Sequence, residues 1–214
     1  MSESSAVRIG IVGVGNIGGA LARHFARAGH ELAVANSRGP ETLGDLIAEL
    51  GPKARAVTAA EALAFGEVAV VSIPLHAIDT LPADGAQAGA VVIDTNNYYP
   101  GRDGRIAALD DDSTTSSELL AARLPGARVV KAFNAIYARW LAERGLPAGD
   151  PGRLAIPIAG DDADSKRLVA ALIDEIGFDA VDAGRLAEGG RKYQPDTPPY
   201  GAEAGAEELR RLLG

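Results

Sequence analysis

Three glycines with the spacing G-x-G-x-x-G lie near the start of the chain, in the stretch 13–18 with the sequence GVGNIG. Between a strand and a helix, the first of these glycines makes a tight turn, the second lets the backbone approach a pyrophosphate, and the third lets the helix pack against the strand. N–H groups at the start of such a helix bind phosphate. The stretch therefore predicts a dinucleotide-binding turn with the residues Gly13, Gly15, Asn16 and Gly18.

The end of the next strand-like segment distinguishes between dinucleotides. An acid placed about 20 residues after the glycines would bind the ribose 2′-hydroxyl of NAD. The sequence instead reads Asn36-Ser37-Arg38. A serine hydroxyl can donate to a 2′-phosphate, and an arginine can pair with it through charge-assisted hydrogen bonds. Asn36, Ser37 and Arg38 therefore predict NADP(H) as the cofactor, and a solvated loop is the alternative interpretation.

Three later strand-like segments also end in residues that can bind a ligand. Ser72, Ile73 and Pro74 close the first of them, Thr95 and Asn96 follow the second, and Asn134 follows the third. Ligands of an open α/β sheet bind outside the carboxyl ends of its strands, so we expect these residues in one cleft around the nicotinamide. The first group offers an apolar wall, and the polar side chains can orient a carboxamide or the acceptor.

Acid–base chemistry has few candidates in this sequence. His76 is the one histidine that follows a strand-like segment, and a structural or solvent-facing role is the alternative for it. Lys131 lies inside an apolar segment and must reach water or a partner charge, so it is either a cation of the site or a lysine that reaches water past the sheet edge. Asn134 completes the catalytic candidates. With three histidines and no cysteine, a metal site has little support.

Other polar and aromatic residues after the segment 90–94 keep two interpretations each. Asp94 can cap the loop that follows it or take part in chemistry. Tyr98 and Tyr99 can stack on a planar acceptor or pack the loop beside Pro100. The sequence leaves these alternatives open.

The elements that must position these residues alternate in type along the chain. Segments rich in Val, Ile and Ala alternate with helix-like segments, which is typical of a parallel sheet covered on both faces. The expected strands span residues 7–12, 31–35, 54–57, 68–73, 90–94, 128–133, 154–159 and 178–182. The sequence therefore predicts an α/β fold, a doubly wound and mostly parallel Rossmann sheet. We expect an NADP-binding domain at 1–150 and a small C-terminal α/β extension and arm at 151–214 that completes the acceptor cleft.

Several local signals mark helix ends. Thr58 and Glu61 have the spacing of a capping box, and Asp162 precedes a helix expected to reach Ile176. Residues 185–201 are rich in Gly and Pro without a period, which predicts an ordered arm or loop before a last helix at 203–213. The length of this arm argues that it packs on something, and a partner subunit is one candidate.

Composition limits the classes of partner. Asp and Glu number 29 and Lys and Arg number 21, a net charge of −8, and the basic residues are scattered. Such a chain is not expected to bind nucleic acid. The absence of cysteine fits a reducing compartment, and no apolar run is long enough to cross a bilayer. We expect a soluble, cytoplasmic protein that acts on a small molecule without binding a membrane.

Five stretches, taken in order, resemble the NADPH-dependent coenzyme F420 (deazaflavin) reductase family. They are IGIVGVGNIG at 9–18, NSR at 36–38, SIP at 72–74, VKAFN at 130–134, and AGDD at 159–162 followed by Ser165-Lys166. The resemblance covers residues 7–184. The loop 95–104 and the tail 193–200 are similar to a bacterial branch of dinucleotide-binding oxidoreductases.

The resemblance implies an NADP-dependent oxidoreductase, often a homodimer, that passes a hydride between NADP(H) and a deazaflavin (coenzyme F420) or flavin-like compound. It implies that the pyrophosphate is contacted by Gly13, Gly15, Asn16 and Ile17. It also implies that Ser37 and Arg38 contact the 2′-phosphate and that Ile73 and Pro74 lie beside the nicotinamide. Two alternatives remain: a redox sensor that binds NADP(H) without turnover, and a reductase of a small carbonyl or imine compound.

The anionic tail of a deazaflavin adds a condition on charge. A protein with net charge −8 attracts this tail only where basic residues gather near the cleft. The candidates for such a gathering are Arg102, Arg105, Arg139, Arg191 and Lys192.

Overall fold

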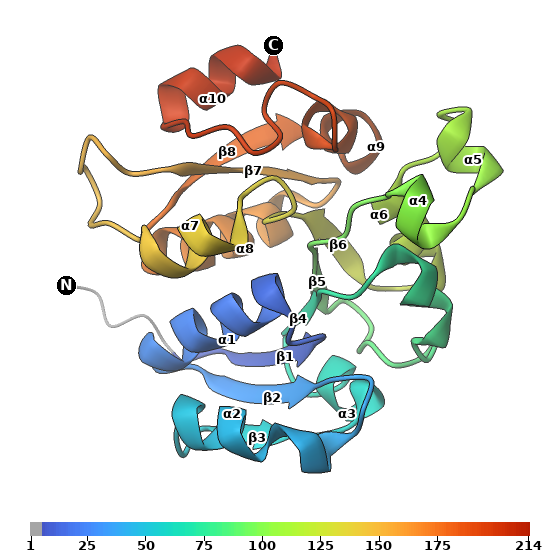
Figure 1. Ribbon diagram of the computed structural model, residues 1–214, viewed down its shortest axis with the longest axis vertical. Coiled ribbons are helices and arrows are strands. Elements are labelled where there is room, and N and C mark those ends of the chain that lie inside the picture. Colours follow the sequence, from blue (N-terminus) through green and yellow to red (C-terminus); the bar gives the residue numbers. More distant parts are fainter. Residues whose placement is uncertain (1–5) are drawn as a thin grey trace.

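Eight strands form one sheet in the computed structural model, which describes residues 6–214 (Figure 1). The strands are β1 (Arg8–Val12), β2 (Glu31–Ala35), β3 (Ala54–Ala56), β4 (Val68–Val71), β5 (Val91–Asp94), β6 (Arg128–Lys131), β7 (Ala155–Gly160) and β8 (Asp179–Gly184). Their order across the sheet is β3-β2-β1-β4-β5-β6-β7-β8. All the predicted strands are confirmed, with each end within two residues of its prediction.

The direction of the strands identifies the fold. Neighbours from β3 to β6 run parallel, β7 runs antiparallel to β6, and β8 runs parallel to β7. The chain begins in the middle and winds first to one side and then to the other, which is the doubly wound Rossmann arrangement. The predicted fold class is confirmed. Hydrogen bonds between β6 and β7 continue the same sheet past residue 150, where we expected a domain boundary.

Helices cover both faces of this sheet. They are α1 (Asn16–Arg27), α2 (Gly44–Leu50), α3 (Ala59–Leu63), α4 (Pro100–Asp103), α5 (Ala107–Asp110), α6 (Ser116–Arg123), α7 (Ala138–Glu143), α8 (Ala163–Glu175), α9 (Leu186–Gly189) and α10 (Ala206–Leu213), with the 3₁₀ turns η1 (Pro40–Leu43), η2 (Leu75–Thr80) and η3 (Gly190–Tyr193). One apolar cluster packs α1, α2, α7 and α8 on one face, and a second packs α3, η2, α6 and α9 on the other.

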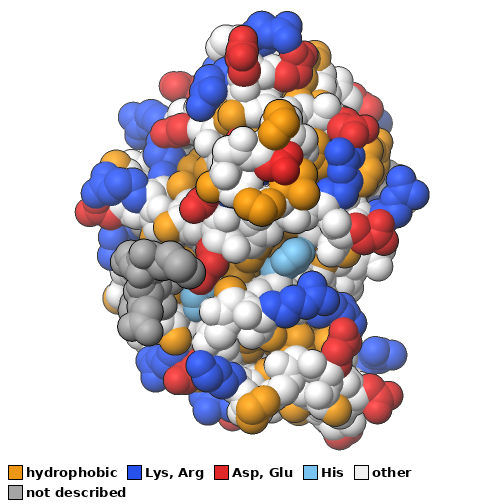
Figure 2. All heavy atoms as spheres, turned by 90° about the vertical axis from the view of Figure 1, so that its left-hand side faces the viewer, with side chains coloured by type: hydrophobic (Ala, Val, Ile, Leu, Met, Phe, Trp, Pro, Cys, Tyr) orange, Lys and Arg blue, Asp and Glu red, His pale blue; other side chains and the backbone are white. Residues whose placement is uncertain are grey.

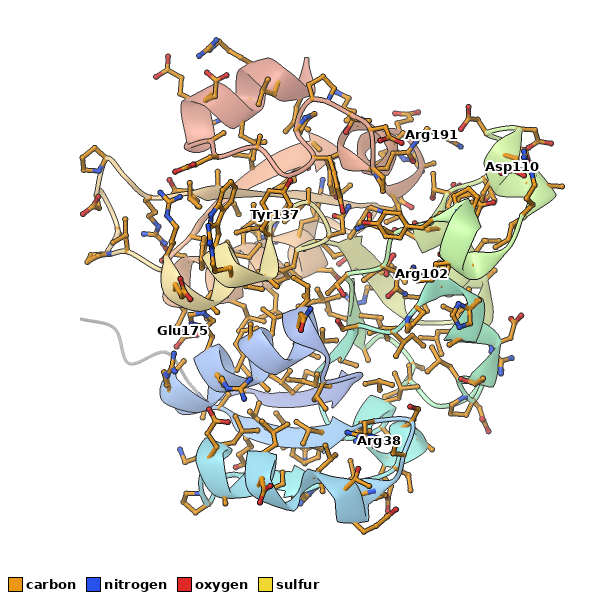
Figure 3. All side chains as sticks on the ribbon, viewed as in Figure 1. Arg38, Arg102, Asp110, Tyr137, Glu175 and Arg191 are labelled. Carbon is orange, nitrogen blue, oxygen red and sulfur yellow. The ribbon has the colours of Figure 1, made fainter. Side chains whose placement is uncertain are left out.

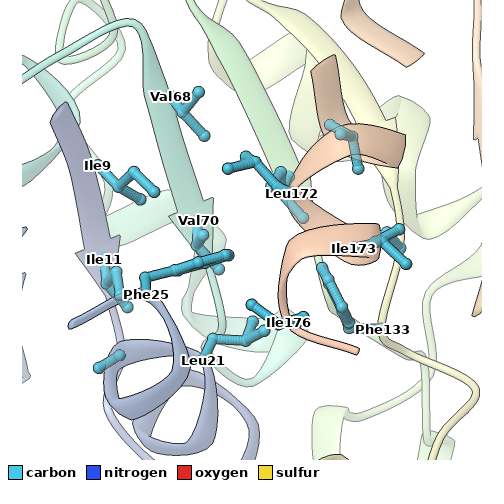
Figure 4. Packing of buried hydrophobic residues seen from close by; sticks show 14 of the residues in the cluster. Ile9, Ile11, Leu21, Phe25, Val68, Val70, Phe133, Leu172, Ile173 and Ile176 are labelled. Carbon is cyan, nitrogen blue, oxygen red and sulfur yellow. The ribbon is translucent and has the colours of Figure 1, made fainter. Parts of the chain in front are cut away.

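The first cluster holds α1 in place (Figure 4). Ile9 and Ile11 of β1 point to the same face because alternate residues of a strand share a face. Leu21 and Phe25 lie one turn apart on α1, and Ile173 comes from α8; all five side chains are fully buried. Burying each one contributes about 1.5 to 3 kcal/mol. This packing places the start of α1 at the carboxyl end of β1.

Two predicted helix starts are confirmed. Thr58 accepts a hydrogen bond from the Glu61 N–H at 3.3 Å, and the Glu61 carboxylate accepts one from the Thr58 N–H at 2.8 Å, which completes the capping box of α3. Asp162 caps α8 by accepting a hydrogen bond from the Ser165 N–H at 2.8 Å. A cap of this kind contributes about 1 kcal/mol to the free energy of unfolding.

The segment 185–201 is an ordered arm, as its sequence predicts. Its first half forms α9 and η3, elements of four residues each, which are too short to show a period. The segment packs on its own chain: the Tyr193 hydroxyl donates to the Lys131 carbonyl at 2.9 Å, and the Gly201 N–H donates to the Ala135 carbonyl at 2.8 Å. The last helix begins at residue 206 instead of 203.

Charges of both signs mix on the surface. On the face shown in Figure 2, Lys and Arg side chains are interspersed with Asp and Glu. Within residues 6–214, every helix is too short or too polar to cross a membrane.

Candidate functional site

A cleft of about 380 Å³ opens at the carboxyl ends of β1, β4, β5 and β6. The predicted cofactor residues that line it are Gly15, Asn16, Ile17, Ser72, Ile73, Pro74, Thr95, Asn96 and Asn134. They come from four separate stretches of sequence and meet because parallel strands end at the same edge of the sheet. The cleft spans the point between β1 and β4 where the order of strands reverses, which is the usual ligand position in this kind of sheet.

The three glycines have different roles in the turn. Gly13 has φ +93°, and a Cβ there would collide with the Ser72 carbonyl oxygen. A Cβ on Gly18 would collide with the Gly13 carbonyl oxygen, so these two glycines serve the close packing of β1, β4 and α1. A Cβ on Gly15 would lie more than 4 Å from the rest of the described chain, its immediate neighbours apart. Gly15 therefore keeps open space at the cleft, as a bound pyrophosphate requires.

The start of α1 faces this space. Gly15 is the N-cap residue, and within residues 6–214 no side chain caps this helix and no acid lies in its first turn. The first N–H groups of a helix lack partners inside the helix and lie at the positive end of its dipole. The twelve-residue helix α1 therefore offers N–H groups to a phosphate.

Ser37 and Arg38, which are predicted to contact a 2′-phosphate, follow Asn36 in the turn after β2, outside the lining of the cleft (Arg38 is labelled in Figure 3). The side chain of Asn36 organises this turn: its Oδ1 accepts from the Arg38 N–H at 2.9 Å and its Nδ2 donates to Thr42 Oγ1 at 2.8 Å. Ser37 and Arg38 are exposed. The Gly13 N–H donates to the Ala35 carbonyl at 2.9 Å, which joins the end of β2 to the glycine turn. A dinucleotide on the turn would thus have Ser37 and Arg38 beside its adenosine ribose.

Two buried asparagines on the cleft wall have atoms without a partner. Asn96 and Asn134 are 3% and 4% exposed. Asn134 Nδ2 donates to Asn97 Oδ1 and to the Tyr193 carbonyl, both at 3.0 Å. Among the described residues, Asn96 Nδ2 and Asn134 Oδ1 have no hydrogen-bond partner. A buried polar atom left unpaired costs about 1 to 3 kcal/mol. One donor and one acceptor match a primary carboxamide, which accepts through oxygen and donates through nitrogen.

Two further cleft residues are held by local structure. The Thr95 hydroxyl donates to the Val71 carbonyl at 3.3 Å, which ties the ends of β4 and β5 together. Phe133 has φ +63°, an unfavourable conformation for a residue with a side chain, and its ring is fully buried. Strain of this kind occurs where the surrounding structure determines it, often at ligand sites. It occurs here in the residue that precedes Asn134.

The other catalytic candidates, His76 and Lys131, lie outside the lining of the cleft. The His76 side chain is half exposed on η2, and its Nδ1 lies 3.0 Å from Asp103 Oδ1. Lys131 is 1% exposed, and its Nζ donates to Ser116 and Ser117. Its ammonium lies neither in the cleft nor in water, but opposite the partner charge of Asp94 on the neighbouring strand. Of the three candidates for catalysis, Asn134 is the one that lines the cleft.

Three tyrosines form a second wall of the cleft: Tyr99, Tyr137 and Tyr200. The Tyr99 and Tyr200 hydroxyls share a short hydrogen bond, and burial together with this bond raises the pKa of Tyr200. Tyr137, marked in Figure 3, is 56% exposed and packs edge to face on Trp140 with the ring centroids 5.0 Å apart. Sequence reasoning considered Tyr99 and missed the other two. Tyr137 lies three residues after Asn134, so its distance from the strand end was the available signal.

Arg102 also lines the cleft, beside the tyrosines. Its guanidinium lies 4.8 Å from the centroid of the Tyr99 ring and pairs with Asp103 at 2.8 Å. Burial alone would raise the pKa of Asp103, but hydrogen bonds from Arg102, Tyr99 and His76 hold it well below the usual range. The carboxylate stays charged and keeps Arg102 at the mouth of the cleft.

A wider hollow of about 680 Å³ lies at the other end of α1, on the side shown in Figure 2. Two of its polar side chains have partners: His24 Nε2 lies 2.6 Å from the Leu141 carbonyl oxygen, and Arg153 pairs with Asp174 at 2.7 Å, although Arg153 Nε has no hydrogen-bond partner among the described residues. Burial lowers the pKa of His24 and favours its neutral form. The cleft at the strand ends, with its unpartnered amide atoms, is therefore the candidate site.

Comparisons with known proteins find similar NADP oxidoreductases. The family model described as "NADP oxidoreductase coenzyme F420-dependent" matches residues 8–98, which include the glycine turn, the turn after β2 and the strand ends of β4 and β5. A solved structure of a candidate F420-dependent NADP reductase from Arthrobacter sp. FB24 is 26% identical, with a TM-score of 0.71, and the match covers 86% of this chain and 89% of that one.

Two other relatives are more similar in sequence. The hypothetical protein SMa0349 from Sinorhizobium meliloti is 32% identical, with a TM-score of 0.78, over 94% of this chain and 96% of that one. The metalloreductase STEAP3 of Rattus norvegicus is 30% identical over 183 residues, 85% of this chain, and this match spans 35% of the metalloreductase. Residues 8–98 therefore match the family of NADP oxidoreductases described as coenzyme F420-dependent, and the chain as a whole is similar in fold to a candidate member of that family.

Proposed function

We propose that this protein transfers a hydride between NADP(H) and a planar acceptor, a deazaflavin (coenzyme F420) or a flavin-like compound. The observation that carries the proposal is a single cleft with two different walls. One wall contains the glycine turn, the start of α1 and the two unpartnered asparagine atoms. The other contains Tyr99, Tyr137 and Tyr200, whose aromatic rings can stack on a flat ring system.

The residues of the cleft have the task of holding and aligning two rings. Bound NADPH supplies a hydride from its nicotinamide ring. Asn96 and Asn134 would hold the carboxamide, and Ile73 and Pro74 would pack against the ring. Alignment of two reactants in a cleft removes much of the entropic barrier to their reaction, so the chain needs no further acid–base group for this step.

The test is a spectrophotometric assay of the purified protein with NADPH and oxidised deazaflavin, with FMN, FAD and a quinone in parallel. We expect NADPH-dependent bleaching of the deazaflavin or of a flavin, at a rate above that of a Gly15→Asp control. Tight NADPH binding without turnover of any of these acceptors would contradict the proposal. It would favour a redox sensor or a reductase of small carbonyl or imine compounds.

Replacing Tyr137 by alanine tests the acceptor wall. Stacking of an aromatic side chain on a flat ring contributes about 1 to 3 kcal/mol, so we expect the KM for the acceptor to rise by about tenfold or more. Tyr137→Phe keeps the ring and should keep the KM. Steady-state kinetics and NADPH titration check both variants, and an equal loss of NADPH affinity in Tyr137→Ala would contradict the assignment of this wall to the acceptor.

The distribution of charge predicts how a deazaflavin would lie. Of the five basic residues considered for its tail, Arg102 is the one that lines the cleft as the structure describes it. Arg105 pairs with Asp110 at 3.0 Å, and Arg191 pairs with Asp112 at 3.5 Å. The oligoglutamate tail would therefore extend into solvent, where screening weakens its interactions. We expect equal KM values for the tailed coenzyme and its tail-less form, and a strong preference for the tailed form at low salt would contradict this.

The proposal includes a cytoplasmic homodimer. Its support is the family resemblance and the composition without cysteine. The segment 185–201, which suggested a partner contact, packs on its own chain, so the subunits would meet elsewhere. Light scattering after gel filtration measures the mass directly, and a monomer would refute the dimer.

A further inference from the structure

Two buried opposite charges lie behind the cleft, where the proposed function does not use them. Asp94 and Lys131 face each other in register at the last pair of β5 and β6, and they are 0% and 1% exposed. The Ser117 hydroxyl donates to Asp94 Oδ2 at 2.5 Å and accepts from Lys131 Nζ at 3.3 Å. Lys131 Nζ also donates to Ser116 Oγ at 3.0 Å. Both serines belong to the first turn of α6, so the carboxylate lies near the positive end of that helix.

Stability alone does not account for this pair. Burial raises the pKa of Asp94 and lowers the pKa of Lys131, and the attraction between the two charges opposes both shifts. Removing each ion from water costs several kcal/mol, and apolar residues of similar volume in place of such a pair are often neutral or stabilising. Two charges at this position therefore call for an explanation other than the stability of the sheet.

Both charges bind the main chain of Asn96. Asp94 Oδ1 accepts from the Asn96 N–H at 2.8 Å, and Lys131 Nζ donates to the Asn96 carbonyl at 3.5 Å. The peptide groups on either side of the Asn96 Cα are thus both held. The direction of the Asn96 side chain follows from them. Asn96 lines the cleft, and its buried Nδ2 has no hydrogen-bond partner in residues 6–214.

The second asparagine is connected to the same lysine. The Tyr193 hydroxyl donates to the Lys131 carbonyl at 2.9 Å, and the Tyr193 carbonyl accepts from Asn134 Nδ2 at 3.0 Å. Tyr193 is fully buried, so this connection is rigid. It leaves Asn134 Oδ1 as the unpartnered acceptor among the described residues.

We propose that Asp94 and Lys131 are positioning residues: by holding the Asn96 main chain from both sides, they aim the Asn96 amide donor at the carboxamide of the nicotinamide. The inference rests on the proposed function in one respect, which is that the nicotinamide end of NADP(H) occupies the cleft. Neither residue touches the cofactor or the acceptor. Their effect on the site passes through Asn96.

A double variant, Asp94→Leu with Lys131→Met, removes both charges together and leaves no lone buried ion. We expect a Tm equal to or above that of the unaltered protein. The Kd for NADPH should rise about tenfold, because one well-directed hydrogen bond to the carboxamide is lost. The Kd for 2′-phospho-ADP-ribose, which has no nicotinamide, should stay unchanged. Calorimetric titration measures both constants without any acceptor.

Three further variants separate positioning from a general loss of structure. Asp94→Asn combined with Lys131→Met keeps an oxygen that can accept from the Asn96 N–H. Compared with the double variant, it should restore most of the NADPH affinity. Asn96→Ala removes the proposed hydrogen bond from the Asn96 amide to the carboxamide of the nicotinamide. Adding Asn96→Ala to the double variant should therefore cause no further loss of NADPH affinity. Arg153→Met is the matched control, because Arg153 is a buried cation, 3% exposed, outside the cleft. It should lower the Tm and leave both Kd values unchanged.

The results distinguish this inference from the proposed function. Binding of NADPH by the unaltered protein, with selective loss in the double variant, supports the positioning role. Unchanged NADPH affinity in the double variant overturns it, as does an equal loss for both ligands, which would mean a merely structural role. If the double variant fails to fold, Ser117→Ala removes the hydroxyl between the charges, and an unchanged NADPH affinity there overturns the inference too. Failure of the unaltered protein to bind NADPH would overturn both proposals.

Discussion

A Gly15→Asp substitution is expected to raise the Kd for NADPH by at least about a hundredfold while the fold is kept. Gly15 has φ −72°, which any residue can adopt, and a Cβ there enters open space, so the native structure has room for the new side chain. The carboxylate would stand where the pyrophosphate needs the N–H groups of α1. Two like charges about 4 Å apart near a protein surface repel by about 4 kcal/mol. Titration calorimetry gives the Kd, and circular dichroism checks the fold.

Gly44→Asp is the matched control for this variant. Gly44 also has a negative φ, −52°, and a Cβ on it would likewise enter open space within the described chain, outside the cleft. This control should bind NADPH as the unaltered protein does. If Gly15→Asp also bound NADPH normally, the pyrophosphate would lie elsewhere and the glycine turn would be only a packing feature.

Replacing Arg38 by alanine is expected to remove the preference for NADPH over NADH. A hydrogen bond to a charged group contributes about 1.5 to 3 kcal/mol, so the NADPH affinity should fall by about tenfold to a hundredfold. NADH has no 2′-phosphate, and its affinity should stay the same. Because Arg38 is exposed and its side chain is outside the hydrogen bonds that shape the turn, stability should not change. The measurement is the ratio of the Kd for NADH to the Kd for NADPH, compared between Arg38→Ala and the unaltered protein at one ionic strength.

Salt and a second arginine separate a direct contact from a general charge effect. Arg27→Ala removes an arginine from the last turn of α1, far along the helix from the glycine turn, and should leave the ratio unchanged. Added salt should narrow the difference between unaltered protein and Arg38→Ala, because exposed charges are screened. An unchanged ratio in Arg38→Ala would show that Arg38 does not select NADP(H).

Features that depend on neighbours in the sequence could be predicted from it. The capping box at Thr58, the cap at Asp162 and the glycine turn each depend on residues within a few positions, so composition and spacing determine them. The strands could also be predicted, because fully buried parallel strands are continuous apolar runs. Because the carboxyl ends of parallel strands lie at one edge of the sheet, the strand ends then predicted which residues come together in the cleft. Asn96 and Asn134 both line it.

Features that depend on contacts between distant segments could not be predicted from the sequence. Tyr200 reaches the cleft only because the segment 185–201 folds back onto β6 and β7, and it bonds to Tyr99, 101 residues earlier. Short elements such as α9 have too few residues for a period, so the sequence predicts only an ordered arm or loop there, without its short helices.

The position of Lys131 depends partly on the sequence and partly on the tertiary structure. The sequence by itself determined that a lysine interrupts an apolar strand of a doubly wound NADP-binding sheet and must find an opposite charge or water. Which of these it finds is decided by the neighbouring strand and by α6, which bring Asp94, Ser116 and Ser117 around its ammonium. Register between strands and the packing of a helix over them are tertiary properties, because they bring together groups that no local spacing relates. The tertiary structure therefore decided that this charge lies behind the cleft instead of in it.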